Sequence, residues 1–159
     1  MADATGSQNV EKYILFKLCD NTYGVPLMST REVVERGPVQ KIPNSKPYFT
    51  GVMDIRGEMI GVINLRTHFY GVADESPNPA VILFNVENGG YGVMVDTLIT
   101  VEEFSFDKID YDPKVASKVP LKFLMGITKY NDEIVSLVNL KLLIEDENQD
   151  RKTSLDKVG

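Results

Sequence analysis

The sequence contains a long internal repeat, which limits the possible folds more than any other feature. Residues 51–66 (GVMDIRGEMIGVINLR) align without a gap with residues 126–141 (GITKYNDEIVSLVNLK), at an offset of 126 − 51 = 75. Residues 16–27 align with residues 84–95 at an offset of 84 − 16 = 68. A repeat of this length indicates two copies of a small unit and not a many-bladed array. Two such copies would present two similar faces and a seam, which suit binding better than catalysis.

Short apolar or alternating segments recur along the chain and predict strands separated by turns. The expected strands are 13–18, 23–27, 28–35, 48–55, 58–65, 80–86, 91–95, 98–104, 123–130 and 133–140. A helical turn is expected at 67–70 and a short helix at 141–147. Many short strands at regular spacing are typical of all-β sandwiches and barrels. The repeat therefore predicts an all-β fold of two small five-stranded barrels that arose by internal duplication.

Turn-forming residues at 74–79 (DESPNP) form the clearest internal boundary. We therefore expect a single domain at 12–147, with a first barrel at 12–76 and a second at 77–147. Each half has about 65–70 residues, which is marginal for an independent core. The two halves should therefore pack on a shared core and unfold together.

The composition argues against several classes of partner. The formal net charge is −6 and no run of Lys and Arg is present, whereas nucleic-acid binders usually carry a basic stripe. Residues 1–11 are polar, and no apolar stretch approaches the length of a membrane span. The sequence therefore predicts a cytoplasmic protein without nucleic-acid binding or direct membrane insertion. Disordered tails are expected at 1–11 and 148–159.

Residues that could support catalysis or metal binding are few. Cys19 and His68 are the only residues of their types, so neither an intrachain disulfide nor a zinc site of about four ligands is available. His68 is not part of a nucleophile–base signature. The acidic loop at 107–112 lacks the spacing of a calcium-binding loop, and the glycines at 89–92 lack the helix and lysine of a phosphate-binding loop. No catalytic residue, cofactor or metal is predicted, and the chain is not expected to be an enzyme.

The Arg56-Gly57 pair at a predicted hairpin tip allows two interpretations. Gly57 could provide a positive φ angle while Arg56 is simply solvated. Alternatively, Arg56 could present a fixed guanidinium to a carboxylate of a partner. The second copy has Asn131-Asp132 at the equivalent position, so the fold itself does not require Arg-Gly.

Several motifs form one pattern that covers residues 12–145. They are FxL at 16–18, GVPL at 24–27, REVV at 31–34, IP at 42–43, GVxDIRGxxIxVINLR at 51–66, GVxVD at 92–96, and Gly126 with KLL at 141–143. In combination, this pattern resembles the CheW-type chemotaxis coupling proteins. The resemblance implies two five-stranded SH3-like barrels around a shared core and a non-catalytic adaptor without a cofactor.

The resemblance also implies partners. Such an adaptor links the cytoplasmic tips of methyl-accepting chemoreceptors to the histidine kinase CheA, in receptor arrays at the inner membrane. One barrel would pair with the regulatory domain of the kinase, and the groove between the barrels would hold the helical hairpin tip of the receptor.

Site residues are implied by the positions that match the family pattern. Three belong to its signature turn, three to a segment on the receptor side, and one to the apolar wall of the seam. In that order, they are Gly51, Arg56 and Gly57; Glu32, Val33 and Val34; and Val101. Asp54 stands where the family usually has Asn, and we expect it to pair with Arg56.

Other functions remain compatible with the residues. The chain could be a coupling protein of a non-flagellar chemosensory pathway. It could be a small ligand-binding β-barrel that uses the seam, although Val, Leu and Ile predominate there. It could bind proline-rich peptides through an aromatic groove. Tyr13, Tyr23, Tyr48 and Tyr91 are available for such a groove, but Tyr23 and Tyr91 occupy equivalent repeat positions, which suggests core roles.

Overall fold

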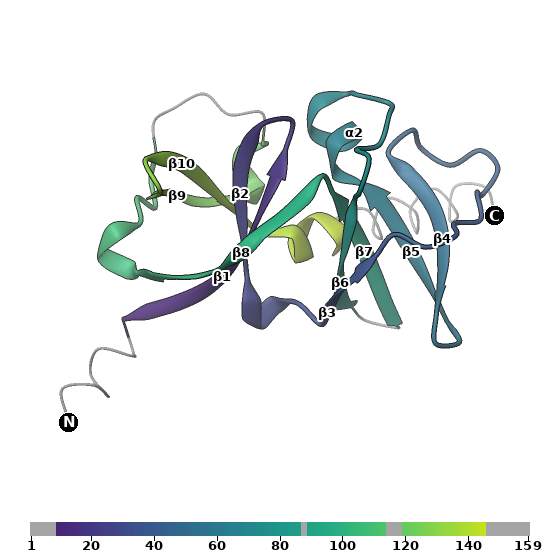
Figure 1. The fold of residues 1–159 in the computed structure, drawn as a ribbon, viewed down its shortest axis with the longest axis horizontal. Helices are drawn as coiled ribbons and strands as arrows, with labels where there is room; N and C mark the ends of the chain where they lie inside the picture. Colours follow the sequence, from purple (N-terminus) through teal and green to yellow (C-terminus); the bar gives the residue numbers. More distant parts are fainter. Residues whose placement is uncertain (1–8, 87–88, 114–118, 146–159) are drawn as a thin grey trace.

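A computed structural model describes residues 9–86, 89–113 and 119–145, and these residues form two curled five-stranded sheets side by side (Figure 1). The first copy of the repeat holds β1 (Val10–Leu18), β2 (Asn21–Pro26), β3 (Glu32–Glu35), β4 (Phe49–Ile55) and β5 (Glu58–Asn64). The second copy holds β6 (Ala80–Val86), β7 (Gly89–Val95), β8 (Thr97–Ser105), β9 (Leu124–Tyr130) and β10 (Glu133–Val138). The helix α2 (Leu65–Tyr70) follows β5, residues 140–145 are helical, and short 3₁₀ turns are η1 (Leu27–Ser29), η2 (Phe106–Lys108) and η3 (Leu121–Phe123).

The two barrels differ in how the chain builds them. One has the strand order β8-β1-β2-β10-β9, and we call it the split barrel because the chain leaves it after β2 and returns at β8. The other has the order β3-β6-β7-β5-β4 and is formed by one uninterrupted stretch, so we call it the continuous barrel. In each barrel one strand pair is parallel, β2 with β10 and β5 with β7.

The expected division into barrels at 12–76 and 77–147 is wrong. Each barrel takes the first two strands of one copy and the last three of the other. The turn-rich residues 74–79 lie between α2 and β6 and stay within the continuous barrel. The chain passes between barrels elsewhere, between β2 and β3 and between β7 and β8. Turn composition marks a change of direction, but it does not show which strands will pair.

The expected all-β fold, with two SH3-like barrels packed on a shared core, is confirmed. Alternate residues of β1 point to opposite sides, as a strand with two buried faces requires. Tyr13 and Leu15 pack inside the split barrel, whereas Ile14, Phe16 and Leu18 pack between the barrels. The equivalent strand β6 alternates in the same way.

The shared core contains residues from both barrels and from the helical residues 140–145, which lie at the centre in Figure 1. Leu140, Leu143 and Ile144 of this segment are fully buried there. Neither barrel could lose its partner without exposing this apolar surface to water. The two barrels should therefore unfold as one unit.

Equivalent glycines allow each barrel to close. A Cβ atom on Gly51 would lie 2.4 Å from the carbonyl oxygen of Gln40, and one on Gly126 would lie 2.7 Å from that of Asp110. At these positions Val52 bridges to Gln40 and Ile127 bridges to Asp110. Glycine is therefore required where two backbones approach closely.

Some expected boundaries are also wrong. The strand expected at 28–35 is shorter, because η1 replaces its first part and β3 begins only at Glu32. The hydroxyls of Ser29 and Thr30 donate to the carbonyls of Pro26 and Leu27, at 2.8 Å each, and these bonds stabilise a turn. Val10 begins β1 and therefore does not belong to the expected tail at 1–11. Residues 1–8 of that tail and the tail at 148–159 lie outside the described residues.

A membrane-crossing helix is not found within the ranges that the structure describes, since none of their helices is long and apolar enough.

Candidate functional site

Arg56 occupies an unusual backbone conformation at the tip of the β4–β5 hairpin. Its φ angle is 50° and that of Gly57 is 88°. The equivalent turn in the second copy, Asn131-Asp132, has φ angles of 49° and 64°. Asn tolerates the left-handed region, whereas a long side chain such as Arg rarely occupies it. Strain of this kind points to a role for Arg56 other than forming the turn.

The Arg56 side chain reaches across to β3. Its Nη2 atom donates to Oε2 of Glu32 at 2.5 Å, and the Arg56 side chain remains 64% exposed. This hydrogen bond is the main reason that the pKa of Glu32 is lowered from its ordinary value. Asp54 does not pair with Arg56 as expected, because it accepts a hydrogen bond from the Gly57 backbone at 2.8 Å. The hairpin tip is thus held by Asp54, and the guanidinium points towards Glu32.

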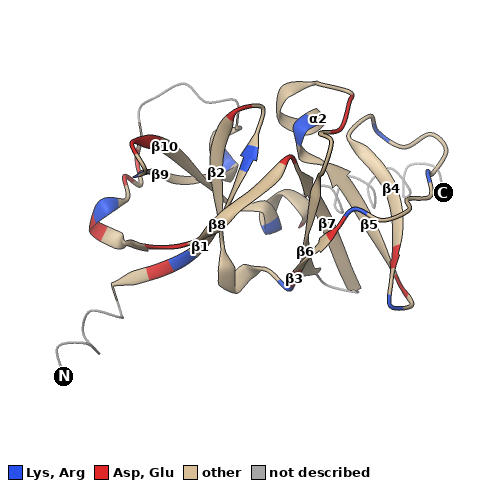
Figure 2. Ribbon diagram, viewed as in Figure 1, with Lys and Arg blue, Asp and Glu red and all other residues tan. Residues whose placement is uncertain are grey.

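Two further charges extend this contact. Nε of Arg31 lies 3.5 Å from Oε2 of Glu32, and Nη1 of Arg31 donates to Oε1 of Glu58 at 2.9 Å. The four side chains form a series of alternating charge, Glu58–Arg31–Glu32–Arg56, which we call the charged tip. The hairpin tip at the lower right of Figure 2 carries both acidic and basic colours. Sequence reasoning missed Arg31 and Glu58 as site residues, because no local pattern shows that positions 31 and 58 meet.

The remaining candidates do not all lie at the charged tip. Val33 packs against the shared core and Val34 against the core of the continuous barrel, and both are half-buried. Gly51 is buried at the barrel closure described above, where it offers no side chain to a partner. Val101 is 49% exposed on β8 of the split barrel, where it pairs with Ile14 of β1. The predicted residues therefore fall into separate groups on both barrels.

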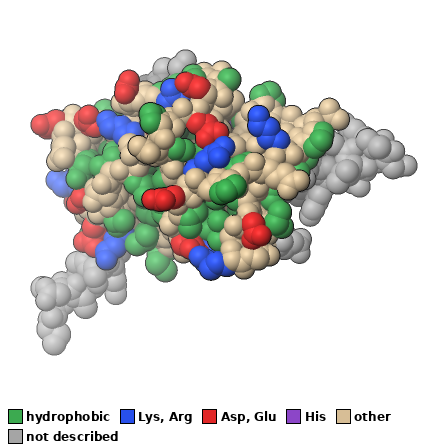
Figure 3. Space-filling view, turned by 45° about the vertical axis from the view of Figure 1, so that its right-hand side comes forward, with side chains coloured by type: hydrophobic (Ala, Val, Ile, Leu, Met, Phe, Trp, Pro, Cys, Tyr) green, Lys and Arg blue, Asp and Glu red, His purple; other side chains and the backbone are tan. Residues whose placement is uncertain are grey.

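β8 also presents apolar side chains to solvent. Its register with β1 shifts between Leu15 and Phe16 of β1. Leu15 pairs with Thr100, Phe16 pairs with Leu98, and Ile99 is skipped. This bulge leaves Leu98 and Ile99 exposed in addition to Val101. We call these three residues the β8 strip. In Figure 3, exposed apolar side chains lie between charged ones on one face of the molecule.

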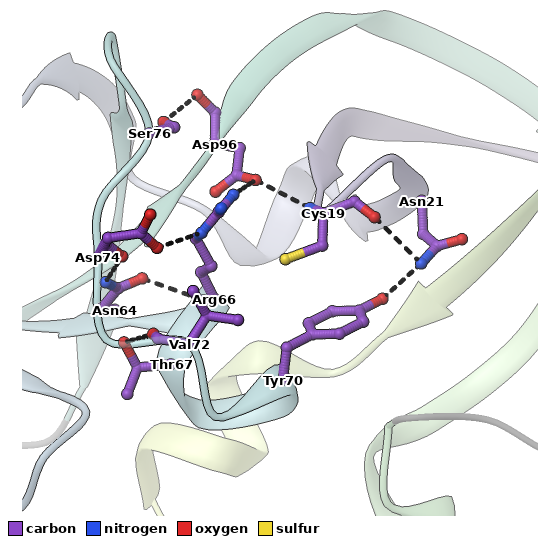
Figure 4. A network of polar contacts seen from close by, with 10 residues as sticks. All are labelled: Cys19, Asn21, Asn64, Arg66, Thr67, Tyr70, Val72, Asp74, Ser76 and Asp96. Atoms are coloured by element: carbon purple, nitrogen blue, oxygen red, sulfur yellow. Dashed lines mark hydrogen bonds and ion pairs between the residues drawn. The ribbon is translucent and has the colours of Figure 1, made fainter.

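A polar network joins the barrels beside the passage from β7 to β8 (Figure 4). The Asp96 carboxylate accepts from the backbone nitrogen of Cys19 at 2.8 Å and from Nη1 of Arg66 at 2.7 Å. Arg66 also donates to Asp74 at 3.1 Å. Cys19 belongs to the split barrel, whereas Arg66 and Asp74 lie in the stretch that forms the continuous barrel.

A second part of this network involves Tyr70 of α2. Its hydroxyl accepts from Nδ2 of Asn21 at 2.8 Å and is hydrogen-bonded to the hydroxyl of Tyr23. These contacts fix the β1–β2 turn against α2. Burial raises the pKa of the Cys19 thiol and outweighs the nearby Arg66, which lowers it, so the unreactive thiol form is favoured. The network therefore has the properties of a mechanical link between the barrels.

The tyrosines give little support to an aromatic peptide groove. Tyr13, Tyr23 and Tyr91 are at most 5% exposed. Tyr48 is half-buried with its ring 4.4 Å from that of His68. The predicted core roles of Tyr23 and Tyr91 are thus confirmed.

Two other features bear on metal ions and nucleic acids. No group of three or more His, Cys, Asp or Glu side chains within 9–86, 89–113 and 119–145 is placed to hold a metal ion. Over the same residues, Lys and Arg are interspersed with Asp and Glu along the ribbon (Figure 2).

Comparison with known proteins places this architecture in a family. The model of the CheW-like domain matches residues 12–148. The chain is 24% identical to the chemotaxis protein CheW of Treponema pallidum, covering 89% of this chain and 86% of that protein. It is 25% identical to protein FrzA of Myxococcus xanthus, covering 87% and 84%.

A solved structure agrees with these relatives. The scaffolding protein TtCheW from Thermoanaerobacter tengcongensis matches with a TM-score of 0.73 and 26% identity, over 84% of this chain and 86% of that one. The expectation of a non-catalytic adaptor agrees with its description as a scaffolding protein. The predicted resemblance is confirmed, and this chain belongs to the CheW-like domain family of chemotaxis scaffold proteins.

Proposed function

We propose that this chain is an adaptor that couples methyl-accepting chemoreceptors to the histidine kinase CheA in signalling arrays. The observation that carries this proposal is the Arg56–Glu32 pair, held on an exposed and strained turn in a chain of the CheW-like family. An arginine that is kept in an unfavourable backbone conformation while exposed to solvent suits recognition of a carboxylate on a partner.

Two kinds of surface support binding to two partners. The charged tip lies on the continuous barrel, and the β8 strip with Val101 lies on the split barrel. We assign Glu32, Arg56 and Gly57 to the charged contact and Val101 to the apolar one. Val33 and Val34 hold β3 in place by packing against the cores, and Gly51 acts indirectly by allowing the barrel to close.

The coupling mechanism follows from the rigid connection between the barrels. The shared core and the Asp96 network hold the barrels in one relative orientation. A partner on one barrel is thereby held in a defined geometry relative to a partner on the other. Interfaces of about 800 Å² per partner or less would be modest individually. Repetition in an array would increase the overall affinity through avidity.

Localisation follows from the proposed partners. The adaptor would work in the cytoplasm, associated with receptor arrays at the inner membrane. It would reach the membrane only through the receptors.

The proposal is tested by calorimetric titration with the regulatory domain of CheA from the same organism, and separately with a receptor cytoplasmic fragment. We expect one-to-one binding in the micromolar range, about −8 kcal/mol. Arg56→Asn should weaken binding to at least one partner while leaving the turn intact, since Asn131 occupies the equivalent position.

Arg36→Asn is the matched control, because Arg36 pairs with Glu75 elsewhere on the continuous barrel. If neither partner binds the wild-type protein at high concentration, the adaptor function is refuted. If both partners bind Arg56→Asn and Arg36→Asn equally well, the charged tip is not the contact.

A further inference from the structure

Glu32 is shared between two arginines of different accessibility. Arg56 lies closer to it, at 2.5 Å, and is 64% exposed, whereas Arg31 lies at 3.5 Å and is only 23% exposed. Arg31 makes its shorter contact, 2.9 Å, with Glu58. The outer arginine is therefore accessible to a partner, while the inner one is confined among the two glutamates.

The position of Arg31 is determined by its surroundings. Its backbone nitrogen donates to the carbonyl of Leu83 at 2.7 Å, which fixes the start of the side chain beside β6. The guanidinium lies over Gly90 of β7, where a Cβ atom would be 2.9 Å from Nη1 of Arg31 and 3.0 Å from Oε2 of Glu58. Gly90 thus leaves the space that the Arg31–Glu58 pair occupies. This inner pair is a packed feature and not a chance encounter of two mobile side chains.

We propose that Arg31 is a positioning residue that neutralises Glu32 when an acidic side chain of a partner takes Arg56, and that Glu58 restrains Arg31 in the free protein. This inference rests on the proposed function of the charged tip. Arg56 can bind a partner carboxylate fully only by leaving Glu32. Without Arg31, that exchange would leave Glu32 with no cation beside it, which disfavours binding. Arg31 needs to move only a short distance to take over.

The proposal predicts opposite effects on partner affinity from two substitutions at residues that do not contact the partner. Arg31→Gln removes the second cation, so Glu32 holds Arg56 more firmly and the partner should bind about two- to five-fold more weakly. Glu58→Gln releases Arg31 towards Glu32, so the partner should bind more tightly by a similar factor. A merely structural role of the Arg31–Glu58 pair would weaken binding in both variants.

The experiment is calorimetric titration of the full chain with whichever partner, CheA regulatory domain or receptor fragment, loses affinity on Arg56→Asn. Arg36→Gln and Glu75→Gln are the matched controls, because they make the same charge changes in another ion pair of the same barrel. In a Glu32→Gln background, Arg31→Gln and Glu58→Gln should no longer change affinity. Effects of the same sign, or effects that persist in that background, would overturn the proposal.

A measurement without any partner separates this inference from the proposed function. The titration of the Glu32 carboxyl group is followed by NMR, with Arg31, Arg56 and Glu58 as the charges around it. In Arg56→Asn, Arg31 should still hold the pKa of Glu32 below its ordinary value, and adding Arg31→Gln should restore that value. If adding Arg31→Gln leaves the titration unchanged, the inference fails while the adaptor function stands. If the titration behaves as expected but Arg56→Asn binds both partners normally, both the inference and the role of the charged tip in partner binding are refuted.

Discussion

The replacement Gly51→Ala tests whether this residue acts in barrel closure or in partner contact. Gly51 has a φ angle of 144°, and a Cβ atom there would lie 2.4 Å from the Gln40 carbonyl oxygen and 2.5 Å from Cγ1 of Val39. The opposing backbone cannot yield freely, because Gln40 and Val52 exchange two hydrogen bonds of 2.9 and 2.8 Å.

The expected loss of stability has three parts. Overpacking costs about 1–3 kcal/mol, the positive φ angle about 1–3 kcal/mol, and weakening of the two bridge bonds about 1 kcal/mol each. Because these effects overlap, we expect a total of about 3–6 kcal/mol, which is a large share of a typical stability of 5–15 kcal/mol. With an m value of about 2 kcal/mol/M, the urea midpoint should fall by about 2 M.

Two other glycines provide controls in the same urea titration, followed by circular dichroism. In Gly126→Ala the added Cβ would lie 2.7 Å from the Asp110 carbonyl oxygen, but the φ angle is not positive. This variant should lose about 2–3 kcal/mol of stability. In Gly57→Ala the added Cβ would have no atom within 4 Å, so only the positive φ angle of 88° opposes the replacement and the loss should be about 1–3 kcal/mol. If Gly51→Ala lost less stability than Gly57→Ala, the closure argument would be refuted and a contact role for Gly51 would regain support.

Three further predictions concern stability and pH. Asp96→Ala should lose about 2–4 kcal/mol in urea unfolding, because it removes the carboxylate that accepts hydrogen bonds from the Cys19 backbone and from Arg66. A loss of stability equal to that of the control Glu103→Ala, at an exposed residue, would contradict the inter-barrel link. Burial raises the pKa of Tyr13 and Tyr23 far above the ordinary range. The folded state therefore keeps protons that the unfolded state loses, so the stability that these two tyrosines contribute should be constant below about pH 10 and be lost as the pH rises above it. Phenolate absorbance checks this, and ionisation of all seven tyrosines near pH 10 in the native protein would disprove it. Arg56→Asn should melt within about 2 °C of the wild type, and a much larger decrease would show that Arg56 is structural.

The repeat in the sequence identified the strands but could not show how they pair. It shows that β2 corresponds to β7 and that β5 corresponds to β10. Equivalence of this kind is compatible with β2 beside β5 and equally with β2 beside β10, and the structure has the second arrangement. The exchange of strands between copies is a long-range property. The turn signal at 74–79 was therefore assigned to the wrong boundary.

The candidate site was predictable in part. The mismatch between Arg56 and Asn131 in the aligned copies is visible in the sequence, and it identified a residue that the turn does not need. The contacts of Arg56 and Arg31 with Glu32 and Glu58 depend on how β3 and the β4–β5 hairpin lie in the barrel. Similarly, the exposure of Leu98 and Ile99 depends on a bulge in β8 that no residue pattern predicts.

The central claim is that one chain bridges two partners, and co-sedimentation tests it most directly. Vesicles that carry a receptor cytoplasmic fragment are incubated with the CheA regulatory domain, with and without this chain, and then pelleted. We predict that the kinase domain enters the pellet only when the chain is present, and that Arg56→Asn reduces its amount while Arg36→Asn does not. A pellet in which the chain accompanies the receptor vesicles but the kinase domain stays in solution would contradict the account.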